Sequence, residues 1–234
     1  GAPALSEDGK SVMNAQLYKQ AMLIAAKHDI PVLAHCEDKS LTNGGCMNED
    51  ERSEELGLPG ICNASEDVIA ARDIILANDT GVKLHLCHCS TKATVVMMKK
   101  AKEEGFRVTA EVCPHHFTLS SEDIPGDDPN YKMAPPLRRR EDVEALRQGL
   151  KEDIMDVIST DHAPHSQADK TGSMRTAAFG IVGLETSVAL TITELVKTGI
   201  LTPMQMAEKM SYNPAKVLGI DRGTLREGAA ADVV

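Results

Sequence analysis

The chain has 234 residues, of which 42% are hydrophobic and 26% are charged, a composition that is typical of a globular protein and excludes a disordered chain. The 25 Lys and Arg residues stand against 35 Asp and Glu residues, so the formal net charge is −10 and we expect no nucleic-acid partner. No run approaches the roughly 18 apolar residues of a membrane span, and no signal-peptide pattern opens the chain, so we expect a cytoplasmic protein without a membrane partner.

Short apolar segments alternate with longer amphipathic ones, which predicts repeated β-α units and a parallel sheet. Residues 1–9 resemble the end of a strand followed by a turn. The clear strands are expected at residues 30–35, 82–88, 106–112 and 156–160. The helices are expected at residues 12–28, at 65–77 with Ser65 as the N-cap, from 90 to just before Gly105, at 141–150 and at 180–196.

Three connections are longer than ordinary loops, and each follows the carboxyl end of an expected strand: residues 37–65, 113–140 and 161–179. Loops of this length in a compact domain are usually functional, and (β/α)₈ barrels place their active sites at this end of the strands. Four β-α units make about half of such a barrel. Both ends of the chain resemble parts of something longer.

The six cysteines are scattered through the chain, at positions 36, 46, 62, 87, 89 and 113. Three of them lie in apolar strand-like segments, so free thiols in a reducing compartment are favoured over disulfides. The one basic run, three arginines at residues 138–140, leads directly into Glu141 and Asp142. We interpret it as the solvent-exposed start of a helix.

Three potential metal ligands stand at the carboxyl ends of expected strands: His35, His88 and Asp161. Because side chains alternate along a strand, His35 shares a face with Leu33 and His88 shares a face with Leu86. If those faces point into the barrel, the two imidazoles converge at its mouth, and with a carboxylate they suit Zn²⁺ or a similar divalent ion. The alternative is a set of buried, hydrogen-bonded histidines, but the repeated strand-end position favours the metal.

Other cysteines and histidines fit packing better than metal binding. Cys87 and Cys89 flank His88, and alternation places both thiols on the strand face opposite His88, so we interpret them as core thiols. His85 is expected on the opposite face from His88, packed toward a helix. The adjacent histidines at 115–116 lie in an expected loop, and a catalytic role for them is the less favoured alternative.

The segment from Thr160 to His165, with Lys170 five residues on, is the most specific pattern in the chain. A carboxylate at a strand end can bind one metal and also accept a proton from metal-bound water, so Asp161 is expected to combine a ligand and a general base. Pro164 stiffens the turn and carries His165 to the rim, where it can contact a substrate.

The motif Thr160-Asp161-x-Ala163-Pro164-His165-x₄-Lys170 closely resembles the second signature of dihydroorotases, with Ser159 where that signature usually has Gly or Ala. Further motifs are similar to the long, class I type of this amidohydrolase superfamily: AHCED at 34–38, HCSTK at 88–92, VTAEVCPHH at 108–116, YKMAPPLR at 131–138 and FGIVGLET at 179–186. The resemblance covers essentially the whole chain.

This resemblance implies a (β/α)₈ barrel that binds one or two Zn²⁺ per subunit and reversibly cyclises N-carbamoyl-L-aspartate to L-dihydroorotate in pyrimidine synthesis. It implies a partial catalytic barrel over residues 1–220 and the start of the return to a small β-sandwich over residues 221–234. It further implies a homodimer, with a carbamoyltransferase as the candidate partner protein.

The resemblance also implies roles for particular residues. His35 and His88 are similar to the ligands of one zinc ion, and Asp161 is similar to the ligand of the other and to the group that moves the proton. Asp8 matches the Asp that class I enzymes place near the metals, where relatives use a carboxylated lysine, so it is the fourth expected metal ligand. The substrate-contact positions are matched by His165, Phe179 and Gly180.

Two features depart from the family pattern. No His-x-His pair occurs in the chain, and Ala134 stands where the family usually has a substrate-binding Asn. One alternative is therefore a related cyclic amidohydrolase, an allantoinase or a dihydropyrimidinase, although those usually have the carboxylated lysine in the place of Asp8. The other is a non-catalytic dihydroorotase-like subunit that scaffolds a carbamoyltransferase, although such proteins typically lose metal ligands.

Overall fold

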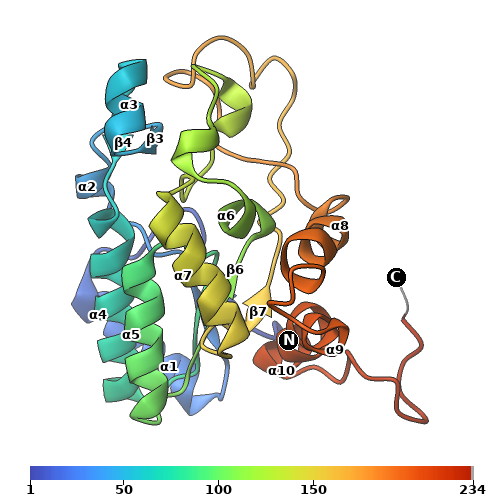
Figure 1. Cartoon of the computed structure of the whole chain (residues 1–234). Coiled ribbons are helices and arrows are strands. Elements are labelled where there is room, and N and C mark those ends of the chain that lie inside the picture. Colours follow the sequence, from blue (N-terminus) through green and yellow to red (C-terminus); the bar gives the residue numbers. More distant parts are fainter. Residues whose placement is uncertain (233–234) are drawn as a thin grey trace.

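The computed structural model describes residues 1–232, and its centre is a five-stranded parallel sheet (Figure 1). In their order across the sheet, the strands are β1 (Leu5–Ser6), β2 (Val32–Ala34), β5 (Leu84–Leu86), β6 (Val108–Val112) and β7 (Val157–Ile158). Every neighbouring pair is parallel, and the order in space follows the order in the chain. The predicted β-α alternation is confirmed, and the first residues contribute a strand of their own to the four that the sequence predicts clearly.

Four long helices lie side by side against one face of this sheet (Figure 1). They are α1 (Ala15–Lys27), α4 (Ala64–Thr80), α5 (Lys92–Glu103) and α7 (Arg140–Lys151). Each lies within a few residues of a predicted helix, because their apolar residues recur at helical spacing and pack on the sheet.

The starts of two of these helices test the predicted caps. Helix α5 begins where expected, because the Thr91 side chain accepts a hydrogen bond from the Thr94 amide. The predicted N-cap of α4 is wrong: Asn63 occupies the cap position, and Ser65 lies inside the helix. The Ser65 hydroxyl instead donates to the Cys62 carbonyl, so it serves the turn that precedes the helix.

Shorter elements occupy the connections and the end of the chain. The connections hold α2 (Lys39–Thr42), α3 (Glu51–Leu56), α6 (Pro114–Thr118), 3₁₀ turns at Ser121–Asp123 and Pro129–Tyr131, and a separate two-stranded sheet of β3 (Met47–Asn48) and β4 (Gly60–Ile61). After β7 come α8 (Ser187–Thr191), α9 (Pro203–Ala207) and α10 (Asn213–Leu218), with π-helical turns at Ile192–Val196 and Glu208–Tyr212. The helix predicted over 180–196 starts only at Ser187.

Alternation along the strands divides the sheet into two faces. Val32, Ala34, Leu84 and Leu86 are buried against the helices in the main hydrophobic core. The alternate positions Leu33, His85 and Thr109 are paired in register across β2, β5 and β6, so they share the other face, which corresponds to the inside of a barrel. The predicted packing of His85 toward a helix is therefore wrong.

The three long connections gather beyond the carboxyl ends of the strands (Figure 1). They share a second hydrophobic cluster, whose buried members are Cys46, Met47, Leu58, Ile124, Met133, Leu137 and Met174. The connections thus pack against one another next to the residues at the strand ends.

The end of the described chain bears on the predicted domain boundary. Residues 219–232 contain turns and no strand. The predicted strand at the end of the chain includes residues 233–234, which lie outside the described residues. A domain boundary at residue 220 therefore stays a prediction.

All six cysteines have free thiols, as predicted. Within residues 1–232, no helix has the length and apolarity that crossing a membrane requires.

Candidate active site

Three side chains converge just past the ends of β1, β2 and β5. His35 Nδ1 lies 3.0 Å from His88 Nε2, and Asp8 Oδ1 lies 3.6 Å from the first nitrogen and 3.5 Å from the second. Both imidazoles are buried, while Asp8 is exposed. The structure therefore brings together three of the four predicted metal ligands.

The backbone at two of the predicted ligands is in the left-handed region. His88 has a φ of 35° and Asp161 has a φ of 47°, values that are uncommon for residues other than glycine. In His88 this turn ends the strand alternation after Leu86, whose side chain packs toward the helices. His88 therefore reaches the site by a change of backbone conformation and not, as predicted, by sharing a face with Leu86.

Asp161 lines the same cavity as the cluster. The cavity has a volume of about 470 Å³, and its walls include Asp8, His35, His88 and Asp161. Asp161 does not join the cluster in which all ligand atoms lie within 4.8 Å of one another. Burial raises the pKa of its carboxyl group, and the nearby His88 opposes that rise.

The charges of the cluster reinforce one another. The hydrogen bond with His88 lowers the pKa of Asp8. Burial opposes protonation of His88, but the hydrogen bond with Asp8 and the charges of Asp161, Glu111 and Asp8 together raise its pKa to about 9. The carboxylates around the two imidazoles therefore favour a positive charge at this site.

The donor set fits a zinc ion. On a tetrahedral zinc ion with bonds of about 2.0–2.1 Å, ligand atoms lie about 3.3 Å apart. The three separations of 3.0–3.6 Å among the His35, His88 and Asp8 ligand atoms are close to that value. Two imidazole nitrogens and one carboxylate oxygen are also the ligand types that zinc prefers, so these residues fit the predicted metal.

Glu111 was missed by the sequence analysis. Its Oε1 accepts a hydrogen bond from the His88 amide at 3.1 Å, and its Oε2 lies 3.0 Å from His85 Nε2. Burial opposes ionisation of Glu111, but His85 and His88 outweigh it and lower the pKa of the carboxyl group. Glu111 therefore holds the backbone of His88, a predicted metal ligand. Strand alternation from Thr109 could have placed Glu111 on the inner face.

Glu37 is a second group that the sequence did not single out. Its carboxylate lies 3.6 Å from His35 Nε2, the ring nitrogen that faces away from the cluster. The interaction with His35 lowers the pKa of Glu37. The contact is electrostatic, because 3.6 Å is too long for a hydrogen bond.

The predicted substrate-contact residues lie together at the rim of the cavity. Phe179 and Gly180 line it, and His165 Nε2 donates to the Phe179 carbonyl at 2.7 Å. Gly180 has a φ of 149°, and a Cβ there would lie 2.5 Å from the Ala163 carbonyl oxygen and 2.8 Å from the His165 ring. A glycine is therefore required for this close approach. Ala134 also lines the cavity.

The histidines at 115–116 do not line the cavity. They lie on α6 and not in a loop, and both are buried. His116 Nε2 donates to the Pro135 carbonyl at 2.9 Å, and burial lowers the pKa of His116 to about 3. These residues pack behind the site.

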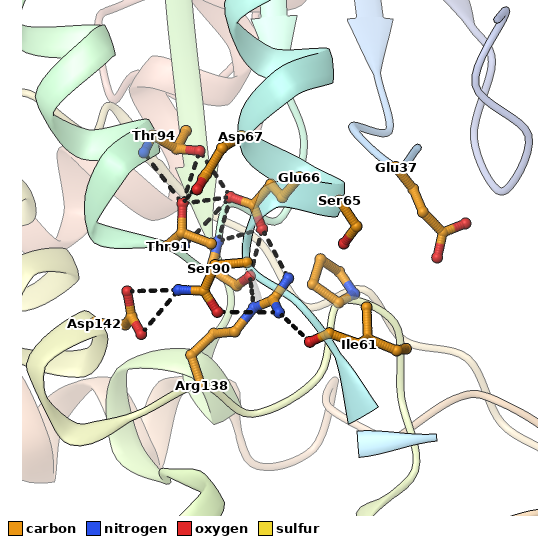
Figure 2. Close-up of polar contacts among 12 residues, drawn as sticks. Glu37, Ile61, Ser65, Glu66, Asp67, Ser90, Thr91, Thr94, Arg138 and Asp142 are labelled. Atoms are coloured by element: carbon orange, nitrogen blue, oxygen red, sulfur yellow. Dashed lines mark hydrogen bonds and ion pairs between the residues drawn. The ribbon is translucent and has the colours of Figure 1, made fainter. Parts of the chain in front are cut away.

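The interpretation of residues 138–140 as a solvent-exposed helix start is wrong for Arg138, which is only 2% exposed. Figure 2 shows its polar contacts. Its guanidinium donates to the Ser90 hydroxyl at 3.0 Å and to the Ile61 carbonyl at 3.1 Å, and it lies 3.8 Å from the Glu66 carboxylate. Glu66 in turn accepts hydrogen bonds from the amides of Ser90 and Thr91. This buried network anchors the segment that follows His88. The run of three arginines in the sequence does not indicate that one of them is buried.

Comparisons with known proteins show which family this chain resembles. The amidohydrolase family model matches residues 1–234. Dihydroorotases from Pelotomaculum thermopropionicum and Ligilactobacillus salivarius are 51% and 50% identical to this chain over its whole length, which corresponds to 55% and 54% of theirs. The chain thus spans about half the length of the curated relatives it matches, and its predicted resemblance to dihydroorotases is confirmed.

Solved structures share the fold. An L-hydantoinase (dihydropyrimidinase) from Arthrobacter aurescens matches 99% of this chain and 53% of its own, with a TM-score of 0.82 at 24% identity. A dihydropyrimidinase from Brevibacillus agri matches 98% of this chain and 53% of its own, with a TM-score of 0.84 at 22% identity. The predicted barrel fold is confirmed, and the chain belongs to the amidohydrolase family.

Proposed function

We propose that the protein is a dihydroorotase that reversibly cyclises N-carbamoyl-L-aspartate to L-dihydroorotate. The observation that carries the proposal is the convergence of Asp8, His35 and His88 in the cavity that Asp161 also lines. Relatives about half identical to the chain bear the name dihydroorotase, which supports this activity over others of the family.

Asp8, His35 and His88 are the residues that would hold a zinc ion, with Asp161 as the candidate ligand of a second one. A zinc ion bound there would supply Lewis-acid polarisation of the amide carbonyl. In the hydrolytic direction, water adds to the ring carbonyl carbon and the carbon–nitrogen bond breaks. Asp161 accepts a proton from the attacking water and delivers it to the leaving ring nitrogen, and the cyclisation reverses these transfers.

The walls of the cavity suit an anionic substrate. Lys39 and Arg175 contribute positive charge to its walls. Both the open-chain and the cyclic compound carry a carboxylate, which these cations attract. Phe179 and Gly180 would contact the ring, and His165 would fix the Phe179 carbonyl through its hydrogen bond.

The free cysteines support a cytoplasmic location, because a reducing compartment keeps thiols unpaired. The homodimer and the carbamoyltransferase partner stay predictions from the resemblance.

The test uses the protein at its natural length. Hydrolysis of L-dihydroorotate and cyclisation of N-carbamoyl-L-aspartate should both be measurable, whereas allantoin and dihydrouracil should be poor substrates. Turnover of dihydrouracil or allantoin in preference to dihydroorotate would favour the related cyclic amidohydrolases. No turnover of any of them by zinc-loaded protein would favour the scaffold.

Elemental analysis tests the ligands independently of activity. His35→Ala and His88→Ala should lower the zinc content, and His28→Ala should leave it unchanged because His28 lies outside the site, at the end of α1. Unchanged zinc in the first two variants would disprove the ligand assignment.

A further inference from the structure

Lys170 belongs to the most specific motif of the chain, yet the proposed chemistry gives it no role. Its ammonium group donates to three main-chain carbonyls: that of Lys132 at 2.9 Å, that of Ala178 at 3.1 Å and that of Gly180 at 2.9 Å. A lysine ammonium has three N–H donors, so these three carbonyls use its full capacity. Two of them lie in the segment that carries Phe179 and Gly180.

Lys132 binds the same segment. Its side chain is only 4% exposed, and its ammonium donates to the Ala177 carbonyl at 2.7 Å. The ammonium also lies 4.3 Å from the centroid of the Phe179 ring, which places a cation over the aromatic face. The Lys132 carbonyl accepts from the Gly180 amide at 3.0 Å as well as from Lys170.

The two lysines therefore bind backbone and not acidic side chains. Within residues 1–232, neither of them takes part in an ion pair with a carboxylate. Hydrogen bonds from a charged donor are stronger than neutral ones, and carbonyls that converge on one cation keep a defined geometry only while the cation is present. The pair thus specifies the shape of the segment.

The flanks of this segment have separate anchors. Met174 is buried in the second hydrophobic cluster, and Ile181 packs against that cluster. Loss of a lysine should therefore alter residues 175–180 locally and leave the surrounding fold in place.

We infer that Lys132 and Lys170 are positioning residues, which hold residues 175–180 in the conformation that presents Phe179 and Gly180 to the substrate. The inference rests on the proposed function for the substrate, but the shape of the segment can be tested without it. His165 depends on the same arrangement, because its ring contacts the Phe179 carbonyl and lies where a Cβ on Gly180 would be.

The kinetic test compares Lys170→Met and Lys132→Met with Lys99→Met, whose lysine is an exposed helix residue paired with Glu152. We expect the KM for L-dihydroorotate to rise about tenfold or more in the first two variants, because displaced contact groups weaken binding. The kcat per bound zinc should change less than about threefold, and the zinc content should be unchanged, because the metal ligands are elsewhere. Lys170→Arg should rescue only part of the KM, because a planar guanidinium does not reproduce three converging N–H donors.

The second readout is cleavage by trypsin after Arg175, an exposed residue within the segment. We expect faster cleavage at this bond in Lys170→Met and Lys132→Met, and the wild-type rate in Lys99→Met. Lys170→Gln replaces Lys170→Met if the latter fails to fold. A wild-type protein that turns over no dihydroorotate would refute the proposed function, while the cleavage rates would still test the positioning role. An unchanged KM per zinc-loaded molecule together with unchanged cleavage after Arg175 would overturn the inference.

Discussion

Asp161 combines a left-handed backbone, a carboxyl group whose pKa is raised by burial, and a place on the wall of the cavity that His35 and His88 also line. A raised pKa brings a carboxylate closer to the pH at which it both accepts and releases protons, which suits a proton shuttle. The side chain lies past the end of β7, outside the packed layers. A substitution there is therefore expected to change catalysis without unfolding the protein.

Asp161→Asn should lower kcat about 10²–10⁴-fold in both directions of the reaction, because the amide cannot accept the proton. Circular dichroism should show an unchanged fold. Asp169→Asn is the control, because that exposed carboxylate only accepts from Ser166 at the surface. If Asp161→Asn kept more than about a tenth of the wild-type turnover, the shuttle role would be excluded.

Ala134 offers a gain-of-affinity test. It lines the cavity, but its methyl group donates no hydrogen bond. Ala134→Asn should lower the KM for dihydroorotate about two- to tenfold, because one added hydrogen bond is worth about 0.5–1.5 kcal/mol. Ala134→Leu adds volume without a donor and should not lower the KM. Steady-state kinetics in which Asn and Leu behave alike would show that the position does not contact the substrate.

At the scale of elements, the buried network around Arg138 joins three parts of the chain (Figure 2). One guanidinium binds Ser90 after β5 and the Ile61 carbonyl in β4, and Arg138 itself lies in the connection that carries Ala134. It therefore fixes the relative position of two walls of the cavity.

Arg138→Met should destabilise the protein by about 3–5 kcal/mol, because it leaves the buried Glu66 carboxylate without its cation. Removing both partners, in Arg138→Met with Glu66→Gln, should cost less than the sum of the two single changes. Arg139→Met is the matched control: its side chain is 44% exposed, and the change should stay within about 0.5 kcal/mol. Urea unfolding measures all four; additive costs for the two buried residues would contradict the network.

At the scale of the whole molecule, a buried carboxyl group makes stability depend on pH. Asp73 of α4 has no exposed side-chain surface, and its Oδ1 accepts from Arg72 Nε at 2.7 Å. Burial raises the pKa of Asp73 from 3.8 to about 6, although Arg72 opposes the rise. Because the folded value is the higher one, the contribution of this group to stability is present below pH 4 and is lost as the pH rises through about 6.

The free energy of unfolding of the wild type should therefore lose up to about 3 kcal/mol from this group between pH 4 and pH 7, at about 1.4 kcal/mol for each pH unit. Asp73→Asn should not show this loss, since its side chain does not titrate. Urea unfolding of both proteins at pH 4 and pH 7 measures the difference. Identical pH dependence in the two proteins would mean that Asp73 is ionised throughout.

Much of the fold could be predicted because it depends on local patterns. Alternating apolar segments predicted the parallel sheet and the helices that cover it, and the strand-end positions of His35, His88 and Asp161 predicted which residues line the cavity. The prediction failed where one residue changes the backbone course: at His88, a left-handed φ ends the alternation, so the side chain reaches the cavity although Leu86 points to the helices.

The sequence by itself determined the β-α order, the ligand candidates and the family, because periodicity and motif spacing are properties of neighbouring residues. Only the tertiary structure decided which polar groups meet across the chain. Glu111 with His85 and His88, Arg138 with Glu66, and Lys170 with the Lys132 carbonyl are all pairings between distant segments. From a sequence alone, a charged side chain is expected to be exposed to solvent. It is buried only where folding places enough polar partners around it to offset the free-energy cost of removing it from water.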